Sequence, residues 1–222
     1  IAGVGSNDTA HAVQMTKTAC EAGADALLAV TPYYNKCTQA GLVAYFEAVA
    51  AASDRPVILY NVPGRTGVTI EPATAALLAK NPRIVGLKDA GESISKTAAT
   101  IARCGDALTV YSGADEKTLP VLSLGGQGVI SVLSNVAPGR MKRLCTKFFE
   151  GKNAEAAALQ AALHPLMEAL FCEVNPIPVK AALAEMGLIE NILRSPLTPL
   201  SECYIEPLQA ALASVCARPL SV

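Results

Sequence analysis

The feature that most limits the possible folds is a regular alternation of short apolar runs with amphipathic segments over the first 152 residues. The apolar runs have the length of strands, and Gly, Pro or Asn breakers separate them from segments of helical periodicity. This alternation favours βαβ units around a parallel sheet. The expected strands are 1–4, 26–30, 57–61, 84–87, 108–111 and 128–132, and the expected helices are one ending at Gly23, 41–52, 71–80, 93–103, 115–122 and 138–151.

The alternation stops after Asn153, and the rest of the chain predicts helices only. We expect them at 154–171, 178–186 and 206–217. The α/β chain therefore divides into six β/α units, residues 1–152, which the resemblance described below implies to be a partial β/α barrel, and a C-terminal helical extension packed on it, residues 153–222.

The composition is that of a globular chain with one sizeable core. Of its 222 residues, 51% are apolar and only 17% are charged. The formal net charge of −1 gives no electrostatic case for binding nucleic acid or an anionic membrane surface. No apolar run approaches the roughly 18 residues that span a bilayer. The seven cysteines form no CxxC pair, so we expect no disulfide framework, no metal site and a reducing, cytoplasmic location. The chain opens directly on Ile-Ala-Gly-Val-Gly, so we expect no signal peptide.

A lysine closes one of the expected strands. The apolar run 84–87 follows the breaker pair Asn81-Pro82 and ends at Lys88. The carboxyl ends of parallel strands face the side of a sheet or barrel where loops build sites. Burial there would lower the pKa of the amine and let it attack a carbonyl, which is Schiff-base catalysis. The alternative is a strand-end lysine whose ammonium only reaches back to water.

Polar side chains follow other expected strands, in the segments TPYYN (31–35), YNVPGRTG (60–67) and SGAD (112–115). In a parallel barrel these positions share one face. Tyr60 can pass a proton and Arg65 can hold a carboxylate with two hydrogen bonds. Taken singly, Tyr60 is equally a packed aromatic and Arg65 a surface charge. Asp89 and Asp115 can support a site or serve as helix caps.

Five segments, in order along the chain, resemble the dihydrodipicolinate synthase family. They are TPYYN, YNVPGRTG, GLKDA, GVISV and NPIPVK (175–180). The family, also called the 4-hydroxy-tetrahydrodipicolinate synthases, is one of the pyruvate-dependent class I aldolase-type lyases. The resemblance covers essentially the whole chain and implies a (β/α)8 TIM barrel that serves lysine and diaminopimelate biosynthesis.

The resemblance also implies roles for five residues of the site. Lys88 would form an imine with pyruvate, and Tyr60 would relay protons to and from it. Arg65 would bind the carboxylate of L-aspartate 4-semialdehyde. Gly113 and Ile130 would line the pyruvate pocket. No metal or organic cofactor is implied, because the protonated imine is itself the electron sink.

The resemblance also implies a role for two tyrosines in the assembly of subunits. Tyr34 would reach across a tight dimer interface into the neighbouring site and join the proton relay, and Tyr33 would stack at that interface. The implied assembly is a homotetramer, a dimer of dimers.

The sequence departs from the family pattern in two ways. Family members begin with two further β/α units, and the second strand ends in a Gly-Thr-Thr-Gly-Glu loop whose threonine links the tyrosines of the relay. We therefore expect a barrel that lacks its first two units, and a fragment that is inactive on its own. Asn7 matches the regulatory site of lysine-inhibited members, but His11 stands where those members have glutamate, so we expect weak sensitivity to lysine.

Two other functions stay open at this point. One is another pyruvate-dependent lyase, such as N-acetylneuraminate lyase or a keto-deoxy sugar acid aldolase. Arg65 and the pair Tyr33-Tyr34 argue against it, because sialic acid lyases resemble this chain around the lysine and lack that arginine. The other is a non-catalytic partial barrel that serves only as a partner subunit.

Overall fold

The computed structural model describes residues 1–215. The chain forms two compact units, residues 1–130 and the residues from Ser131 onward. This division by compactness differs from the sequence division between residues 152 and 153, which follows the β/α alternation and stays a prediction. The residues after 215, which include the end of the expected extension, lie outside the described part of the chain.

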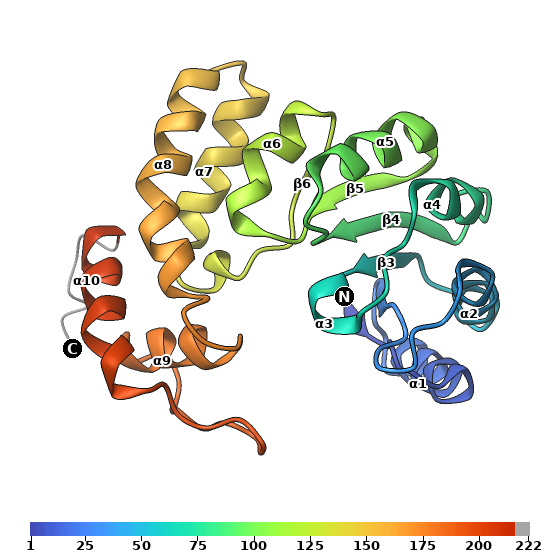
Figure 1. Cartoon of the computed structure of the whole chain (residues 1–222), viewed down its shortest axis with the longest axis horizontal. Helices are drawn as coiled ribbons and strands as arrows, with labels where there is room; N and C mark the ends of the chain where they lie inside the picture. The colour runs from blue at the N-terminus through green and yellow to red at the C-terminus, as the bar shows by residue number, and fades with distance from the viewer. Residues whose placement is uncertain (216–222) are drawn as a thin grey trace. The chain divides into compact units, whose positions relative to one another are not determined.

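The first unit is built on a sheet of six parallel strands in sequential order (Figure 1). Each strand pairs with its neighbour in the sequence, which is the order found in the wall of a β/α barrel. All six carboxyl ends therefore lie at one edge of the sheet. The strands are β1 (Ala2–Gly3), β2 (Leu27–Val30), β3 (Val57–Asn61), β4 (Ile84–Asp89), β5 (Thr109–Ser112) and β6 (Gly128–Val129).

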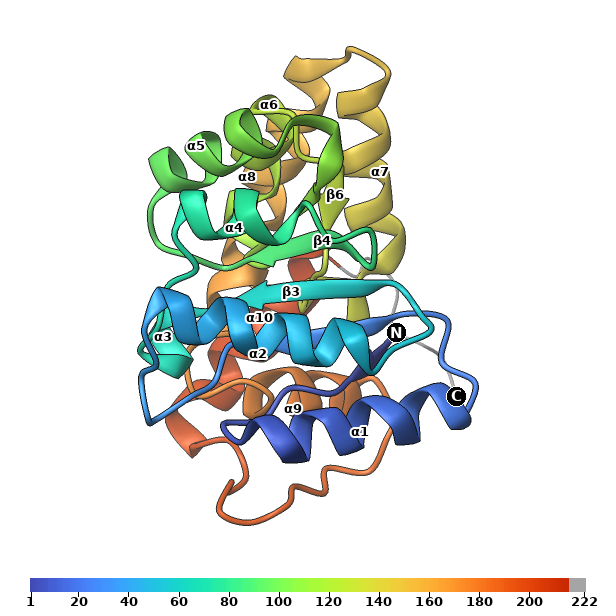
Figure 2. The same cartoon turned by 90° about the vertical axis from the view of Figure 1, so that its right-hand side faces the viewer.

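Helices α1, α2, α4 and α5 lie along one face of this sheet (Figures 1 and 2). Side-chain caps explain where three of them begin, because Asp8, Thr38 and Ser93 each accept a hydrogen bond from a backbone N–H of the first turn. The helices of this unit are α1 (Thr9–Glu21), α2 (Gln39–Ala51), α3 (Pro63–Thr66), α4 (Pro72–Leu78), α5 (Ile94–Cys104) and α6 (Thr118–Ser123).

One apolar cluster joins the sheet to these helices. Leu27, Leu59 and Leu87 bring strands into the cluster, and Phe46 and Leu78 bring helices. Each is at most 2% exposed, and burying a side chain of this size stabilises a fold by about 1.5–3 kcal/mol. The core therefore fixes the strands whose ends carry the candidate site.

The second unit is helical within the described residues. It contains α7 (Pro138–Phe149), α8 (Asn153–Ala169), α9 (Ile177–Glu185) and α10 (Ile205–Val215). Helix α8 packs on both α7 and α10, and α10 also contacts α9. Within residues 1–215, no helix is long and apolar enough to cross a membrane.

The expected α/β fold with a parallel sheet is confirmed, and several element ends are corrected. Strand β6 ends at Val129 and not at residue 132, because the chain turns into a 3-10 helix, Leu133–Asn135. The segment 115–122 begins as a 3-10 turn, Asp115–Lys117, before α6. The four-residue helix α3 was not expected. The expected helix 206–217 is α10 as far as residue 215, and its last two residues lie outside the described residues.

Candidate active site

Lys88 and Tyr60 come from neighbouring strands and are direct partners in the register of β3 and β4. The Nζ atom of Lys88 lies 4.2 Å from the centre of the Tyr60 ring. Both side chains are half-buried. A cation at this distance over an aromatic ring is attracted by the negative face of the ring. The structure therefore brings together the predicted nucleophile and the predicted proton relay.

The surroundings shift the pKa values of both groups. Burial lowers the pKa of Lys88 below that of an ordinary lysine, the carboxylate of Asp115 opposes this shift, and Arg65 adds to it. Burial raises the pKa of the Tyr60 phenol, and Arg65 opposes that shift. A lowered amine pKa increases the share of neutral, nucleophilic lysine near neutral pH. A phenol with a raised pKa keeps its proton and can donate it.

Arg65 is exposed and belongs to the short helix α3, which follows β3 directly. Pro63 opens the helix, and Gly67 ends it with φ 74°, a left-handed conformation that glycine adopts without strain. The buried hydroxyl of Thr31 donates to Oγ1 of Thr66 at 2.9 Å, which ties the helix to the end of β2. This bond holds the arginine helix beside the segment that carries the two tyrosines.

The same region forms a shallow groove that contains both predicted interface tyrosines. Its lining is Tyr33, Tyr34, Lys36, Pro63, Gly64, Arg65, Thr66 and Gly67. Tyr34 is 89% exposed and has φ 74°, a conformation that is rare for a residue with a large side chain. The structure therefore places Tyr33, Tyr34 and Arg65 around one open groove, with the Tyr34 side chain almost wholly in solvent.

Gly113 and Ile130 stand just after β5 and β6, on the same edge of the sheet as Lys88. The backbone N–H of Gly113 donates to the carbonyl of Asp89 at 2.7 Å, and that of Ile130 donates to the carbonyl of Ser112 at 2.8 Å. A Cβ on Gly113 would lie 3.1 Å from Cγ of Lys88. Gly113 therefore lies against the lysine, and Ile130 lies two strands away from it.

Asn7 precedes α1, and His11 lies in the first turn of that helix. The carbonyl of Asn7 accepts a hydrogen bond from the side chain of Asn35 at 2.9 Å, which links it to the segment carrying Tyr34. The Nδ1 atom of His11 lies 3.1 Å from the hydroxyl of Ser6. Asn7 thus contacts the segment that carries Tyr34, whereas His11 contacts Ser6, which follows β1.

Two side chains that were not singled out as site residues contact the strand ends closely. Asn61, buried directly after Tyr60, donates to the carboxylate of Asp89, directly after Lys88. Lys117 donates from Nζ to the carbonyl of Gly91 at 2.8 Å, in the loop after β4. The only sequence signal for Asn61 was its position inside the YNVPGRTG segment, next to Tyr60. Within residues 1–215, no three His, Cys, Asp or Glu side chains gather as they would around a metal ion.

Comparisons with known proteins show which family this chain resembles in sequence and fold. The chain is 50% identical over 214 residues to the 4-hydroxy-tetrahydrodipicolinate synthase of Thioalkalivibrio sulfidiphilus, a match that spans 96% of this chain and 73% of that protein. The crystal structure of dihydrodipicolinate synthase from Thermotoga maritima matches with a TM-score of 0.94 at 44% identity, over 96% of this chain and 74% of that one.

A third relative has been solved with a small molecule bound. The dihydrodipicolinate synthase from Acinetobacter baumannii, complexed with pyruvate, matches with a TM-score of 0.93 at 48% identity, over 96% of this chain and 74% of that one. Residues 1–215 match the dihydrodipicolinate synthetase family. At this level of identity and coverage, the chain belongs to the dihydrodipicolinate synthetase family.

Proposed function

We propose that this protein condenses pyruvate with L-aspartate 4-semialdehyde to give 4-hydroxy-tetrahydrodipicolinate, a reaction of lysine and diaminopimelate biosynthesis. The observation that carries the proposal is the pairing of Lys88 with Tyr60, in which the pKa of a half-buried amine is lowered beside a phenol. This pairing provides a nucleophile and a proton carrier at adjacent strand ends.

The chemistry follows from the lysine. The neutral amine of Lys88 attacks the ketone carbon of pyruvate, and loss of water leaves a protonated imine. Loss of a methyl proton from the bound pyruvate gives an enamine, whose carbon attacks the aldehyde of the semialdehyde. The amino group of the new chain then attacks the imine carbon, which closes the ring and releases the amine of Lys88.

The proposed roles of the other residues follow their positions. Tyr60 is proposed to move protons to and from the imine, and Tyr34 is the proposed second member of the relay, supplied to the site of a neighbouring subunit. Arg65 is the proposed partner of the semialdehyde carboxylate, because a guanidinium matches a carboxylate with two hydrogen bonds. Gly113 and Ile130 are proposed to border the bound pyruvate.

Assembly, location and the finer fold belong to the same proposal. The 89% exposure of Tyr34 supports a role for this side chain at an interface, as in the expected homotetramer built as a dimer of dimers, with Tyr33 stacked beside it. The sequential order of the six parallel strands supports their membership in an eight-stranded barrel. A cytoplasmic location remains a prediction from the cysteine pattern.

Borohydride trapping tests the covalent step. Pyruvate and borohydride together should add mass to the Lys88 peptide of the full-length protein, because reduction fixes the imine as a stable amine. Lys88→Ala should abolish the label. Label on Lys80, Lys96 or Lys180 in place of Lys88 would refute the assignment of the nucleophile.

The arginine separates this reaction from that of other pyruvate lyases. Arg65→Ala should keep pyruvate trapping and lose condensation with aspartate semialdehyde, since alanine has no guanidinium to hold the carboxylate of the second substrate. Normal turnover of the semialdehyde by this variant would show that the substrate is wrongly assigned.

A further inference from the structure

The two strand ends that carry Tyr60 and Lys88 are joined a second time on the opposite face of the sheet. Asn61 and Asp89 follow them in the sequence and are themselves partners in the register of β3 and β4. Successive side chains of a strand point to opposite faces, so this second pair points away from the lysine. The Nδ2 atom of Asn61 donates to Oδ1 of Asp89 at 2.8 Å.

Asp89 is buried and accepts hydrogen bonds through both of its carboxylate oxygens. Its Oδ1 also accepts from the backbone N–H of Gly91 at 2.9 Å, and its Oδ2 accepts from the hydroxyl of Thr97 on α5 at 2.7 Å. The side chain is 7% exposed. A buried carboxylate with three donors around it is held in one orientation, because any rotation leaves a donor or an oxygen unpaired.

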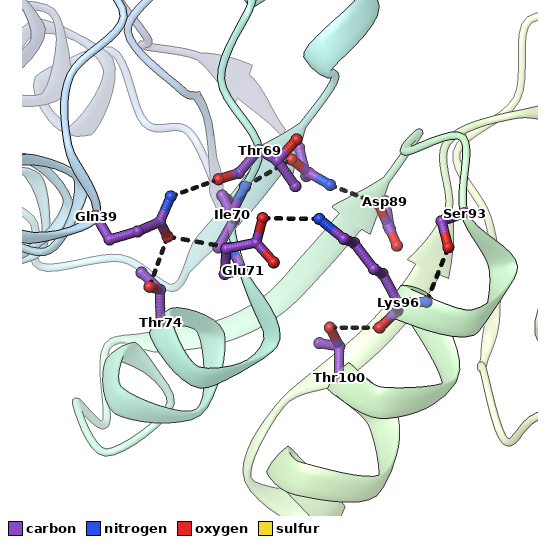
Figure 3. A network of polar contacts seen from close by, with 10 residues as sticks. Gln39, Thr69, Ile70, Glu71, Thr74, Asp89, Ser93, Lys96 and Thr100 are labelled. Carbon is purple, nitrogen blue, oxygen red and sulfur yellow. Dashed lines mark hydrogen bonds and ion pairs between the residues drawn. The ribbon is translucent and has the colours of Figure 1, made fainter.

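Asn61 is held at its other end as well. It is 4% exposed, and its Oδ1 accepts from the backbone N–H of Ile70 at 3.0 Å. Figure 3 shows Asp89 and Ile70 in a polar network that continues through Glu71 to Gln39 and Lys96. The amide therefore spans from the segment before α4 to the strand end after the lysine.

The space around the pair is tight. A Cβ on Gly91 would lie 3.0 Å from Oδ1 of Asp89 and 3.1 Å from Nδ2 of Asn61. Two backbone hydrogen bonds complete the link, from Ala90 to the carbonyl of Asn61 at 2.8 Å and from Gly113 to the carbonyl of Asp89 at 2.7 Å. A displaced Asp89 would therefore move Gly113 too, the residue that lies against Lys88.

We propose that the Asn61–Asp89 pair is a positioning element that sets the distance and angle between the amine of Lys88 and the phenol of Tyr60. The inference rests on the proposed function, since it assigns the pair to imine formation and proton transfer. The pair does not touch the reacting atoms. It acts through the backbone of the two strand ends, where a shift of about 1 Å can cost about 100-fold in rate.

A charge-swap experiment tests the pair. Asn61→Asp places two carboxylates against each other, and the double variant Asn61→Asp with Asp89→Asn restores one carboxylate and one amide in reversed positions. The single variant should form the pyruvate imine about 100-fold more slowly in single-turnover trapping. The double variant should recover part of the lost rate, because an amide at position 89 can donate to the new carboxylate but no longer offers its oxygen to the N–H of Gly91. The Kd for pyruvate should change much less than the rate constant.

A matched control uses the same network without touching the pair. Lys96→Met removes the exposed ion pair with Glu71, whose Nζ–Oε1 distance is 2.7 Å, and should leave the imine rate within 2-fold of the wild type. If Asn61→Asp does not fold, Asn61→Ala keeps the test available, because it removes the bridging amide without adding charge. That variant should also lower the rate constant of the folded protein and shift its pH–rate profile.

The outcomes separate the inference from the proposed function. A wild-type protein that does not trap pyruvate on Lys88 would refute the proposed function itself. Trapping in the wild type combined with unchanged rate constants in folded Asn61→Asp and Asn61→Ala would overturn only the positioning role. A lower melting temperature with an unchanged rate per folded molecule would also overturn it, since the pair would then act in stability alone.

Discussion

Gly113 lies so close to Lys88 that no other residue fits there without movement. A Cβ at this position would stand 2.9 Å from Cβ of Ala90, 3.1 Å from the backbone N of Ala90 and 3.1 Å from Cγ of Lys88. The backbone N of Ala90 cannot move aside as easily as the end of a flexible side chain can. Ala90 and the Lys88 side chain would therefore have to shift, which would disturb the position of the amine over the Tyr60 ring.

Gly113→Ala should consequently lose imine formation by about 100-fold while the protein stays folded. The matched control is Gly139→Ala in α7, where a new Cβ meets nothing within 4 Å and where alanine is favoured over glycine by roughly 1 kcal/mol. Pyruvate trapping and thermal melting measure the two effects. An active Gly113→Ala variant would show that the strand end can yield.

The pH dependence of imine formation should respond in opposite directions to two substitutions. Asp115 raises the pKa of Lys88 and Arg65 lowers it. Asp115→Asn should therefore lower the pKa of Lys88 further and move the ascending limb of the rate profile to lower pH. Arg65→Ala should raise the pKa and move the limb to higher pH. If both variants moved the ascending limb in the same direction, the charges of Asp115 and Arg65 would not control the pH dependence of imine formation.

Much of the fold was predictable because strand and helix lengths were marked by breakers. The apolar run 84–87, which follows the breaker pair Asn81-Pro82, predicted a buried strand, and β4 begins at Ile84 as expected. Tyr60 and Lys88 could be placed at strand ends from sequence alone. Their register, which makes them neighbours, comes from the pairing of β3 with β4 and has no local signal.

The features that the sequence did not reveal are long-range or conformational. The bond between Asn61 and Asp89 joins residues 28 positions apart, and either side chain alone reads as a cap or turn residue. The positive φ of Tyr34 has no sequence signature, because glycine or asparagine is the usual residue there. Helix α3 is a single turn, too short to show helical periodicity.

The hydroxyl pair Thr31–Thr66 should contribute to stability in a way that a double substitution reveals. Thr66→Val leaves the buried Thr31 hydroxyl without its acceptor and removes the bond from the N–H of Val68, so unfolding free energy should fall by about 1–3 kcal/mol. Replacing both threonines by valine should cost less than the sum of the single changes. Urea unfolding of the three variants gives the coupling, and strict additivity would argue against the bond.

Inhibition by L-lysine should be weak and should strengthen on one substitution. His11 lies in the first turn of α1 and offers no carboxylate to the ammonium of an effector. His11→Glu adds one, and an acidic residue also suits the first turn of a helix, so the variant should fold. The control is His164→Glu, the other histidine of the chain, which should not change inhibition. Tight inhibition of the wild type in a lysine titration would contradict the expectation.

Tyr34 should prove to be a strained residue that is retained for its side chain. A left-handed φ of 74° costs an L-residue roughly 1–2 kcal/mol, and the side chain, 89% exposed, gains little from packing within the chain. Strain of this kind gathers at functional sites. Tyr34→Gly should therefore be more stable than Tyr34→Ala by about 1 kcal/mol, because both variants have lost the same ring and only the alanine keeps a Cβ at the positive φ.

Tyr34→Phe keeps the ring and should lower kcat while pyruvate trapping on Lys88 persists. Denaturant unfolding compares the stabilities of Tyr34→Gly and Tyr34→Ala, and steady-state kinetics with pyruvate trapping tests Tyr34→Phe. An alanine variant as stable as the glycine one would remove the strain argument, and full activity of Tyr34→Phe would remove the hydroxyl from the relay.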